Sequence, residues 1–261
     1  MERTTHPNCK INLGLHVVGK RPDGYHDLET IFLPVPDLCD ELEITEVGSG
    51  SDSVMVQDGI TLDNAPDDNL CMKAYRLLHS EFGIPPVVIR LKKNIPFGAG
   101  LGGGSSDAAF TLKMLNAMFS LGLDDTAIEQ RAAQLGADCA FFVKNQPTYA
   151  TGIGDRLEPI TNLKIENLKL KIEIPDGEHV STREAYCGLK RDLFGSTRSD
   201  LREAVKRPVA EWRNLIVNDF EASVFPSHPA IAELKESMYR RGAIYASMTG
   251  SGAAVFGLFP A

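Results

Sequence analysis

PFGAGLGGGSSDAA, at residues 96–109, is the stretch that carries most information in this 261-residue chain. Five of the seven residues from 98 to 104 are glycine, and a glycine loses more backbone freedom on folding than any other residue. Such a loop is typical of sites where main-chain N–H groups approach a phosphate closely, with the positive end of a helix dipole aimed at the same anion. The stretch therefore predicts a nucleotide-phosphate cradle that opens a helix, rather than a flexible glycine linker.

The sequence on either side of this loop predicts a strand before it and a helix after it. Residues 87–93 alternate in the manner of a strand, and from Ala108 to Phe119 apolar residues recur at steps of three and four, which indicates one buried helical face. We expect one of the residues 105–107 to cap this helix. A further helix is expected to begin with a capping box at 126–129 and to end at Gly136.

Other patterns along the chain predict an α+β fold with two domains. Strands are expected at 9–18, 28–35, 41–47, 168–174, 244–247 and 253–259, and helices at 70–82, through much of 182–219, and at 231–241. The sequence becomes polar around Pro159, which indicates a domain boundary. We therefore predict an N-terminal ATP-binding and catalytic domain at 1–160 and a C-terminal substrate-binding domain at 161–261.

Composition excludes several classes of protein. The formal charge of −8 argues against a nucleic-acid surface, which needs a basic stripe. The five cysteines are scattered without a C-x-x-C pair, which fits a reducing compartment, and no His, Cys or carboxylate cluster has metal-ligand spacing. No signal peptide or membrane span is apparent. We expect a cytoplasmic protein that acts on a small molecule, binds no nucleic acid or membrane, and is a monomer or weak homodimer.

The glycine loop by itself leaves two kinds of enzyme open. It lacks the lysine of a Walker A motif, but it contains the G-x-G-x-x-G pattern at Gly98, Gly100 and Gly103, with Asp124 about 20 residues further on. These features also fit an NAD(P)-dependent oxidoreductase. Asp124, however, precedes a helix instead of ending a second strand, and the motif follows a β-rich beginning.

Four further motifs give the chain a resemblance to a known family. The glycine loop, followed by Asp138, resembles that of the small-molecule kinases named after galactokinase, homoserine kinase, mevalonate kinase and phosphomevalonate kinase. KINL at 10–13, RPDGYH at 21–26, LGAD at 135–138 and MTGSG at 248–252 are similar to motifs of one branch, the 4-diphosphocytidyl-2-C-methyl-D-erythritol kinases. They span nearly the whole chain in the order of that family.

The resemblance implies transfer of the γ-phosphoryl group of ATP to the 2-hydroxyl of 4-diphosphocytidyl-2-C-methyl-D-erythritol, on the non-mevalonate route to isoprenoid precursors. It implies that Asp138 is the catalytic base and that Lys10 lies against the reacting hydroxyl. Mg²⁺ is expected to arrive with ATP, held mainly by phosphate oxygens, with Ser105 or Ser106 able to add a ligand. The residues implied for ATP are Asn69, Lys93, Pro96, Phe97, Gly98, Ala99, Gly100, Leu101, Gly102, Gly103, Gly104, Ser105, Ser106 and Asp107.

On the substrate side, the resemblance implies that Tyr25 and His26 recognise a cytosine ring. The remaining residues that it implies for the substrate are Asn12, Thr182, Gly250, Ser251 and Gly252. Taken without the resemblance, the sequence favours an ordinary turn residue for Asp138 and packing for the Tyr25-His26 pair. For the 249–252 segment it leaves open both a loop of backbone donors and a plain hairpin turn. A kinase of the same superfamily acting on another alcohol, such as mevalonate or homoserine, is the nearest alternative because it would not need Tyr25 and His26.

Overall fold

The computed structural model describes residues 1–48, 50–60, 68–161, 163, 165, 167–189 and 199–261. The chain forms two compact units, each built from several segments. The first unit comprises Met1–Lys10, Pro34–Phe97 and Gly102–Asn145, and the second comprises Ile11–Leu33, Gly98–Leu101 and Gln146–Ala261. The expected domain boundary at 160/161 stays a prediction.

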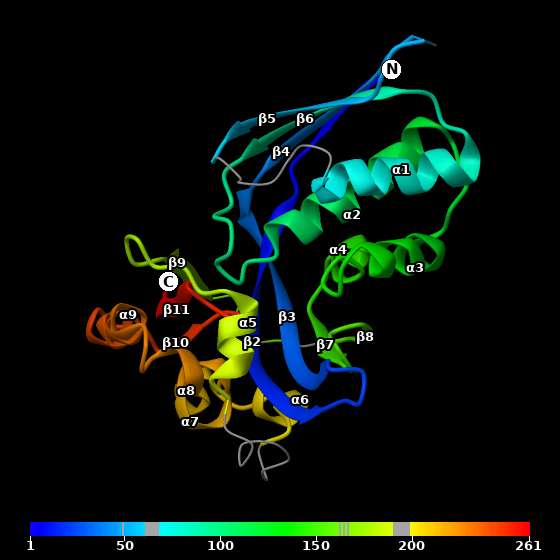
Figure 1. Cartoon of the computed structure of the whole chain (residues 1–261). Helices are drawn as coiled ribbons and strands as arrows, with labels where there is room; N and C mark the ends of the chain where they lie inside the picture. Colours follow the sequence, from blue (N-terminus) through cyan, green and yellow to red (C-terminus); the bar gives the residue numbers. More distant parts are fainter. Residues whose placement is uncertain (49, 61–67, 162, 164, 166, 190–198) are drawn as a thin grey trace. The chain divides into compact units, whose positions relative to one another are not determined.

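The first unit is a four-stranded sheet with helices packed on one face (Figure 1). Its strand order is β1-β4-β6-β5, with β5 parallel to β6 and the other neighbours antiparallel. The strands are β1 (Glu2–Thr5), β4 (Glu41–Glu46), β5 (Val54–Gly59) and β6 (Val87–Lys93), and the helices are α1 (Leu70–Phe82), α2 (Gly103–Met118), α3 (Asp125–Leu135) and α4 (Phe141–Lys144).

A buried apolar layer between this sheet and its helices holds the first unit together. The side chains that form it are at most 1% exposed; they are Leu42 and Ile44 of β4, Ile89 of β6, Leu78 of α1 and Leu112 of α2. Burying a side chain of this size contributes about 1.5–3 kcal/mol. The layer fixes the end of β6 and the start of α2, which are the two elements that flank the glycine loop.

Two sheets form the framework of the second unit. One has the order β2-β3-β7-β8, with β2 and β3 extending from the first unit, and the other has the order β10-β11-β9. Their strands are β2 (Asn8–Lys20), β3 (His26–Cys39), β7 (Thr148–Thr151), β8 (Arg156–Pro159), β9 (Leu168–Glu173), β10 (Tyr245–Met248) and β11 (Val255–Pro260). The helices are α5 (Thr182–Cys187), α6 (Leu201–Ala204), η3 (Val209–Glu211), α7 (Trp212–Leu215), α8 (Phe220–Val224) and α9 (Pro229–Arg240).

The helices of the second unit pack on β10 and β11 around buried side chains such as Val224, Ile231, Met238 and Val255. Trp212 is fully buried and meets the Tyr245 ring edge to face, with 5.6 Å between the ring centroids. This core supports β10 and the turn after it, residues 249–254, from one side.

Most expected elements are confirmed, and the helix caps are the main errors. The helix at 70–82 and the strand at 87–93 have the expected bounds. Residues 105–107 lie inside α2, whose cap is Gly102 in a left-handed conformation without a side-chain bond. Helix α3 begins two residues earlier than the capping box at 126–129 implied, because its cap is Asp124, whose carboxylate accepts the Ala127 N–H at 2.8 Å.

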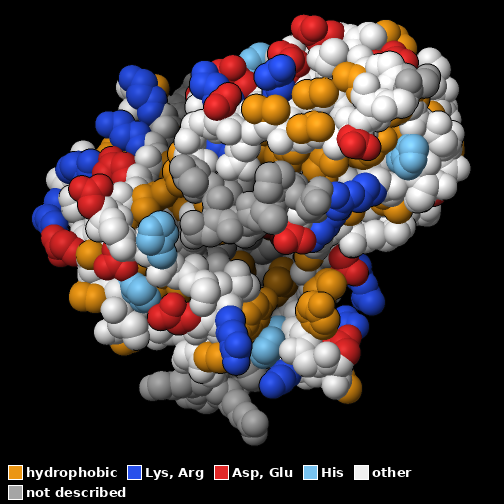
Figure 2. All heavy atoms as spheres, turned by 45° about the horizontal axis from the view of Figure 1, so that its top comes forward, with side chains coloured by type: hydrophobic (Ala, Val, Ile, Leu, Met, Phe, Trp, Pro, Cys, Tyr) orange, Lys and Arg blue, Asp and Glu red, His pale blue; other side chains and the backbone are white. Residues whose placement is uncertain are grey.

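Helical structure in the 182–219 region is confirmed only in short segments, and residues 190–198 of this prediction lie outside the described residues. Within the described parts of the chain, no helix is long and apolar enough to span a bilayer. On the face shown in Figure 2, lysine and arginine side chains are interspersed with aspartate and glutamate.

Candidate functional site

In the glycine loop, glycines with a left-handed backbone alternate with buried apolar residues. Gly98, Gly100 and Gly102 have φ values of 65°, 76° and 71°, a left-handed conformation that glycine adopts without strain. Ala99 and Leu101, between them, are buried at 3% and 1% exposure. The loop is thus anchored by two buried apolar side chains, and its first part, Gly98–Leu101, belongs to the second unit.

The other part of the loop, from Gly102 onward, opens α2 in the first unit. A Cβ at position 103 would lie 2.9 Å from Ile95 Cγ2, so close packing requires glycine there. Gly104 differs, because a Cβ at that position would have only Leu70 Cδ1, at 4.0 Å, nearby. A helix would be more stable with alanine at such a position. The bare backbone at Gly104 is therefore not required by the packing of this unit, and open space beside a helix N-terminus fits a phosphate group.

Two serines follow in the first turn of α2, and they have different surroundings. Ser105 is hydrogen-bonded to Cys139, whereas Ser106 Oγ is fully buried and has no partner among the described residues. An orphaned buried hydroxyl is costly unless a ligand or ion completes it. The described part of the chain contains no cluster of three His, Cys, Asp or Glu side chains that could hold a metal. The buried Ser106 hydroxyl is therefore a polar atom at the start of α2 that a ligand or ion can complete.

Lys10 and Asp138 come together in the first unit. The Lys10 ammonium lies 3.4 Å from Asp138 Oδ2, with the lysine side chain buried and the carboxylate about one-third exposed, at 4% and 32%. A Cβ at Gly102 would lie 3.1 Å from Lys10 Cε, so the lysine stem runs along the start of α2. A buried cation next to an accessible carboxylate can stabilise developing negative charge while the carboxylate accepts a proton.

Asp138 lies in the turn between α3 and α4, as its position after Gly136 predicts. Its neighbour Cys139 is buried, and burial raises the pKa of that thiol to about 12. The thiol is therefore neutral near pH 7, which leaves the carboxylate as the proton acceptor of this turn. The Cys139 Sγ atom would lie 3.2 Å from a Cβ at Gly136, so the turn packs closely on the end of α3.

Lys93 is placed differently from a lysine that is free to contact a ligand. Its ammonium, 3% exposed, forms ion pairs with Asp40 and with Asp107, the latter at 2.7 Å. Asp40 Oδ1 also accepts the N–H groups of Asn94 and Ile95, at 2.6 and 2.8 Å. This buried triad ties the end of β6 to the N-terminal part of α2. It thus holds the two segments of the first unit that flank the glycine loop.

The remaining residues expected near ATP are divided between structural and exposed positions. Asn69 caps α1, with its side chain accepting the Cys71 N–H at 2.9 Å. Pro96 is partly buried, and Phe97 presents its ring to solvent at 57% exposure. Phe97 is thus available to a flat ligand, whereas Asn69 is used by its own helix.

On the substrate side, the second unit displays one exposed aromatic ring and one stacked ring. Tyr25 is 63% exposed, and its N–H donates to Asp23 Oδ1 at 3.1 Å, which holds the turn. The His26 ring stacks on Tyr186 of α5, with 4.6 Å between centroids and 20° between the planes. Sequence reasoning missed Tyr186, because its one signal is an aromatic residue in a short helix remote in sequence from Tyr25.

Helix α5 also meets the turn at residues 249–254, here called the late loop, in the second unit. Thr182 Oγ1 lies 3.4 Å from Ser251 Oγ, and Gly250 and Gly252 have φ values of 54° and 94°. Asn12 is 2% exposed, and its Nδ2 donates to Thr30 Oγ1 at 2.9 Å. The structure thus places Asn12 as a buried residue of β2, while Ser251 is partly accessible.

The chain matches two models of one family and is similar to several known proteins. The models are the GHMP kinases N terminal domain, at residues 69–146, and the GHMP kinases C terminal, at residues 200–261. The chain is 52% identical to 4-diphosphocytidyl-2-C-methyl-D-erythritol kinase of Bacteroides fragilis, over 98% of this chain and 91% of that protein. It is 51% identical to the protein of the same name from Porphyromonas gingivalis, over 97% and 90%.

Solved structures give the same result at lower sequence identity. A crystal structure of 4-(cytidine 5'-diphospho)-2C-methyl-D-erythritol kinase superposes with a TM-score of 0.79 at 33% identity, covering 99% of this chain and 90% of that one. The mevalonate kinase of Methanococcus jannaschii shares the fold, with a TM-score of 0.71 at 16% identity over 99% and 91% of the two chains. With relatives about half identical along nearly its whole length, the chain belongs to the 4-diphosphocytidyl-2-C-methyl-D-erythritol kinase family of GHMP kinases.

Proposed function

We propose that this enzyme transfers the γ-phosphoryl group of ATP to the 2-hydroxyl of 4-diphosphocytidyl-2-C-methyl-D-erythritol, a step toward isoprenoid precursors. Membership of the kinase family supports the reaction class and the substrate. Among the structural observations, the Lys10–Asp138 pair beside the start of α2 carries the proposal. A phosphate-binding helix start, a buried cation and an accessible carboxylate are the groups that phosphoryl transfer to an alcohol requires.

In the proposed reaction, the substrate oxygen attacks the γ-phosphorus and the bond from that phosphorus to the bridging oxygen of ADP breaks. The hydroxyl proton moves to Asp138 Oδ2 or Oδ1, and Lys10 stabilises the negative charge around the attacking oxygen. The N–H groups from Gly102 to Ser105 face the phosphates, where the helix dipole adds to their attraction. Water exclusion and orientation of the hydroxyl are the remaining contributions of the protein.

We propose that the Ser106 hydroxyl would contact Mg²⁺ bound to ATP, an ion that would neutralise phosphate charge. The buried and unpartnered state of that hydroxyl among the described residues supports this assignment. Asn69, Lys93, Pro96, Phe97 and Asp107 form the wider ATP site, with Lys93 and Asp107 acting through the buried triad and Asn69 through the cap of α1. The remaining glycine-loop residues supply the backbone surface.

The substrate side is proposed to consist of Asn12, Tyr25, His26, Thr182, Gly250, Ser251 and Gly252. Tyr25 offers an exposed face for stacking on cytosine, and the His26 ring is oriented by Tyr186. Desolvation and, to a smaller extent, Lys20 lower the pKa of His26, which keeps its ring neutral near pH 7 and able to donate and accept one hydrogen bond each. A neutral imidazole suits the polar edge of a pyrimidine.

The experiment that tests this proposal is ADP release by purified protein with ATP, Mg²⁺ and a panel of alcohols. The panel contains 4-diphosphocytidyl-2-C-methyl-D-erythritol, mevalonate and homoserine. We expect turnover with the cytidyl alcohol only, and ³¹P NMR of its product to show a new phosphomonoester on the 2-oxygen. Turnover with mevalonate or homoserine in its place would contradict the assignment of substrate.

A protein of this kind is proposed to work in the cytoplasm as a monomer or weak homodimer. The two-domain division at 160/161 is likewise a proposal. Sedimentation of the purified chain across a concentration series measures the state of assembly directly. A concentration-independent dimer would contradict this part.

A further inference from the structure

Thr249 lies at a hydrogen-bonded junction inside the second unit. Its Oγ1 accepts the Asn12 N–H at 3.0 Å, and it lies 3.3 Å from Asn12 Oδ1 and 3.4 Å from the Gly100 carbonyl oxygen, either of which can accept its proton. The residue is completely buried. One hydroxyl thus contacts strand β2 and the Gly98–Leu101 part of the glycine loop at the same time.

The backbone on either side of this contact is closely packed. The Thr249 N–H donates to the Ala254 carbonyl at 2.9 Å, and the Ala254 N–H donates to the Ala99 carbonyl at 3.2 Å. A Cβ at Gly100 would overlap the Thr249 carbonyl oxygen. The backbone of the late loop therefore lies directly against the backbone of the first part of the glycine loop, with no space for a side chain between them.

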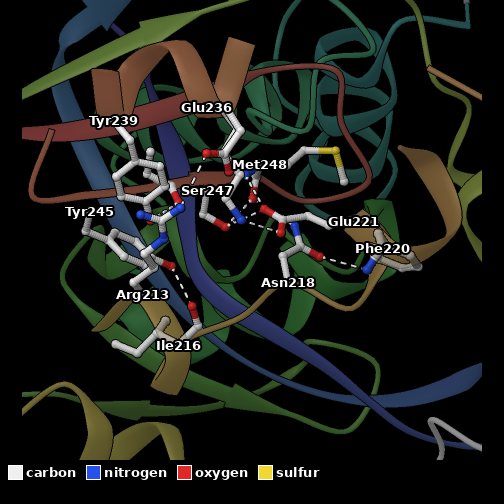
Figure 3. Close-up of polar contacts among 12 residues, drawn as sticks. Arg213, Ile216, Asn218, Phe220, Glu221, Glu236, Tyr239, Tyr245, Ser247 and Met248 are labelled. Carbon is white, nitrogen blue, oxygen red and sulfur yellow. Dashed lines mark hydrogen bonds and ion pairs between the residues drawn. The ribbon is translucent and has the colours of Figure 1, made fainter. Parts of the chain in front are cut away.

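Asn218 holds the late loop from another side. Its Nδ2 donates to the Met248 and Gly250 carbonyl oxygens, both at 2.8 Å, and these are the carbonyls on either side of Thr249. Its Oδ1 accepts the Phe220 N–H at 3.0 Å, which orients the amide (Figure 3). Both N–H groups of the amide are engaged, which holds the main chain before and after Thr249. The direction of the Thr249 side chain is set by this fixed main chain.

Glu221 adds a second fixed point immediately before Thr249. Its Oε1 accepts the Met248 N–H at 2.9 Å and the Ser247 hydroxyl at 3.0 Å, while its Oε2 pairs with Lys235 at 2.6 Å (Figure 3 shows the first two contacts). The segment from Asn218 to Glu221 thus supports the end of β10 through side-chain bonds to main-chain groups. Such bonds fix the backbone more firmly than apolar packing, because their geometry is directional.

We propose that the Thr249 hydroxyl is a positioning group for phosphoryl transfer. It holds strand β2 and the glycine loop in fixed positions relative to each other. Asn12 lies two residues after Lys10 and Gly100 lies two residues before Gly102, so each contact of Thr249 holds the chain next to a residue of the proposed chemistry. The role belongs to the hydroxyl, which accepts one hydrogen bond and donates another. The inference rests on the proposed kinase function and assigns to it a residue whose side chain touches neither ATP nor the alcohol.

A matched pair of variants separates this role from simple packing. Thr249→Ser keeps the hydroxyl and removes a methyl group, whereas Thr249→Val keeps the shape and removes the hydroxyl. We expect kcat of the serine variant within about threefold of the parent and kcat of the valine variant lower on the order of tenfold to a hundredfold, because small misplacements of reacting groups are costly. The KM values for ATP and for the cytidyl alcohol should change less than kcat.

The reverse ranking would overturn the inference, since a packing role predicts that valine, which fills the same buried space, is tolerated better than serine. Thermal unfolding of both variants accompanies the kinetics. If Thr249→Val does not fold, Thr249→Ala replaces it, and equal kcat values for Ala and Ser would then contradict the proposal. A parent protein without turnover on the cytidyl alcohol would instead contradict the proposed function, so the two failures are distinguishable.

Discussion

The Lys10 ammonium and the Asp138 carboxylate face each other at 3.4 Å, with the cation buried and the anion partly exposed. The two partners differ in accessibility, because the lysine is enclosed by the protein whereas the carboxylate can contact a ligand. Lys10 comes from β2 and Asp138 from the turn after α3, far apart in the sequence. The pair therefore exists only in the folded unit.

Asp138→Asn should lower kcat by about 10²–10⁴, because the amide cannot accept the hydroxyl proton. Lys10→Met should also lower kcat. In the double variant the loss of kcat should be much smaller than the product of the two single losses, since the two side chains act as one unit. Steady-state ADP release measures all three. Asp125→Asn, at an exposed position in the first turn of α3, is the matched control and should leave kcat unchanged. Multiplicative losses in the double variant would show that the two groups act independently.

Tyr25→Ala should raise the KM for the cytidyl alcohol and leave the KM for ATP unchanged. Stacking of one base on an aromatic ring contributes roughly 1–3 kcal/mol, which corresponds to about 5- to 150-fold in affinity. Because the ring is 63% exposed, thermal stability should not change. Phe97→Ala is the reciprocal control, since we expect it to raise the KM for ATP alone. Full activity of Tyr25→Ala at low concentrations of the cytidyl alcohol would disprove its role.

Gly104→Ala should stabilise the protein and weaken ATP binding together. The new methyl group meets open space in the first unit and favours the helix by about 0.5–1 kcal/mol, so the melting temperature should rise. The same methyl group occupies the space that we assign to phosphate, so the KM for ATP should rise as well. Gly19→Ala, also in open space but outside the loop, is the control for ATP binding. A stabilised variant with an unchanged KM for ATP would place the phosphates elsewhere.

Asp107→Asn should remove a pH dependence of stability. Burial raises the pKa of Asp107 to about 7, against the pull of Lys93 and with a further increase from Asp40. Between about pH 4 and pH 7 the folded protein therefore binds more protons at this site than the unfolded chain, so the unfolding free energy falls as the pH rises through that window. Above pH 7 this contribution is constant.

Urea unfolding of parent and Asp107→Asn at pH 5 and at pH 8 measures the effect. We expect the stability of the variant relative to the parent to be greater at pH 8 than at pH 5. Asp125→Asn, which removes an exposed carboxylate, is again the control. A difference between variant and parent that is the same at both pH values would mean that Asp107 titrates as in the unfolded chain.

The sequence alone determined the local elements and the kinds of chemistry. Alternating residues defined β2 and β6, helical spacing defined α1, and the glycine loop with its neighbouring motifs indicated an ATP-dependent kinase. These signals are local because backbone preference and the period of burial act over a few residues. The same local reasoning misplaced the caps of α2 and α3, where Gly102 and Asp124 were preferred over nearby Ser and Thr by the geometry of the turn.

Only the tertiary structure decided which residues act together and in what state. Nothing in the order of the chain shows that Lys93 is held between Asp40 and Asp107, that His26 stacks on Tyr186, or that Thr249 joins Asn12 to Gly100. Such contacts depend on distances between segments far apart in sequence, which burial of the two cores fixes. Side-chain type and spacing thus determined the reaction that this protein is equipped for, and packing decided which of those side chains meet.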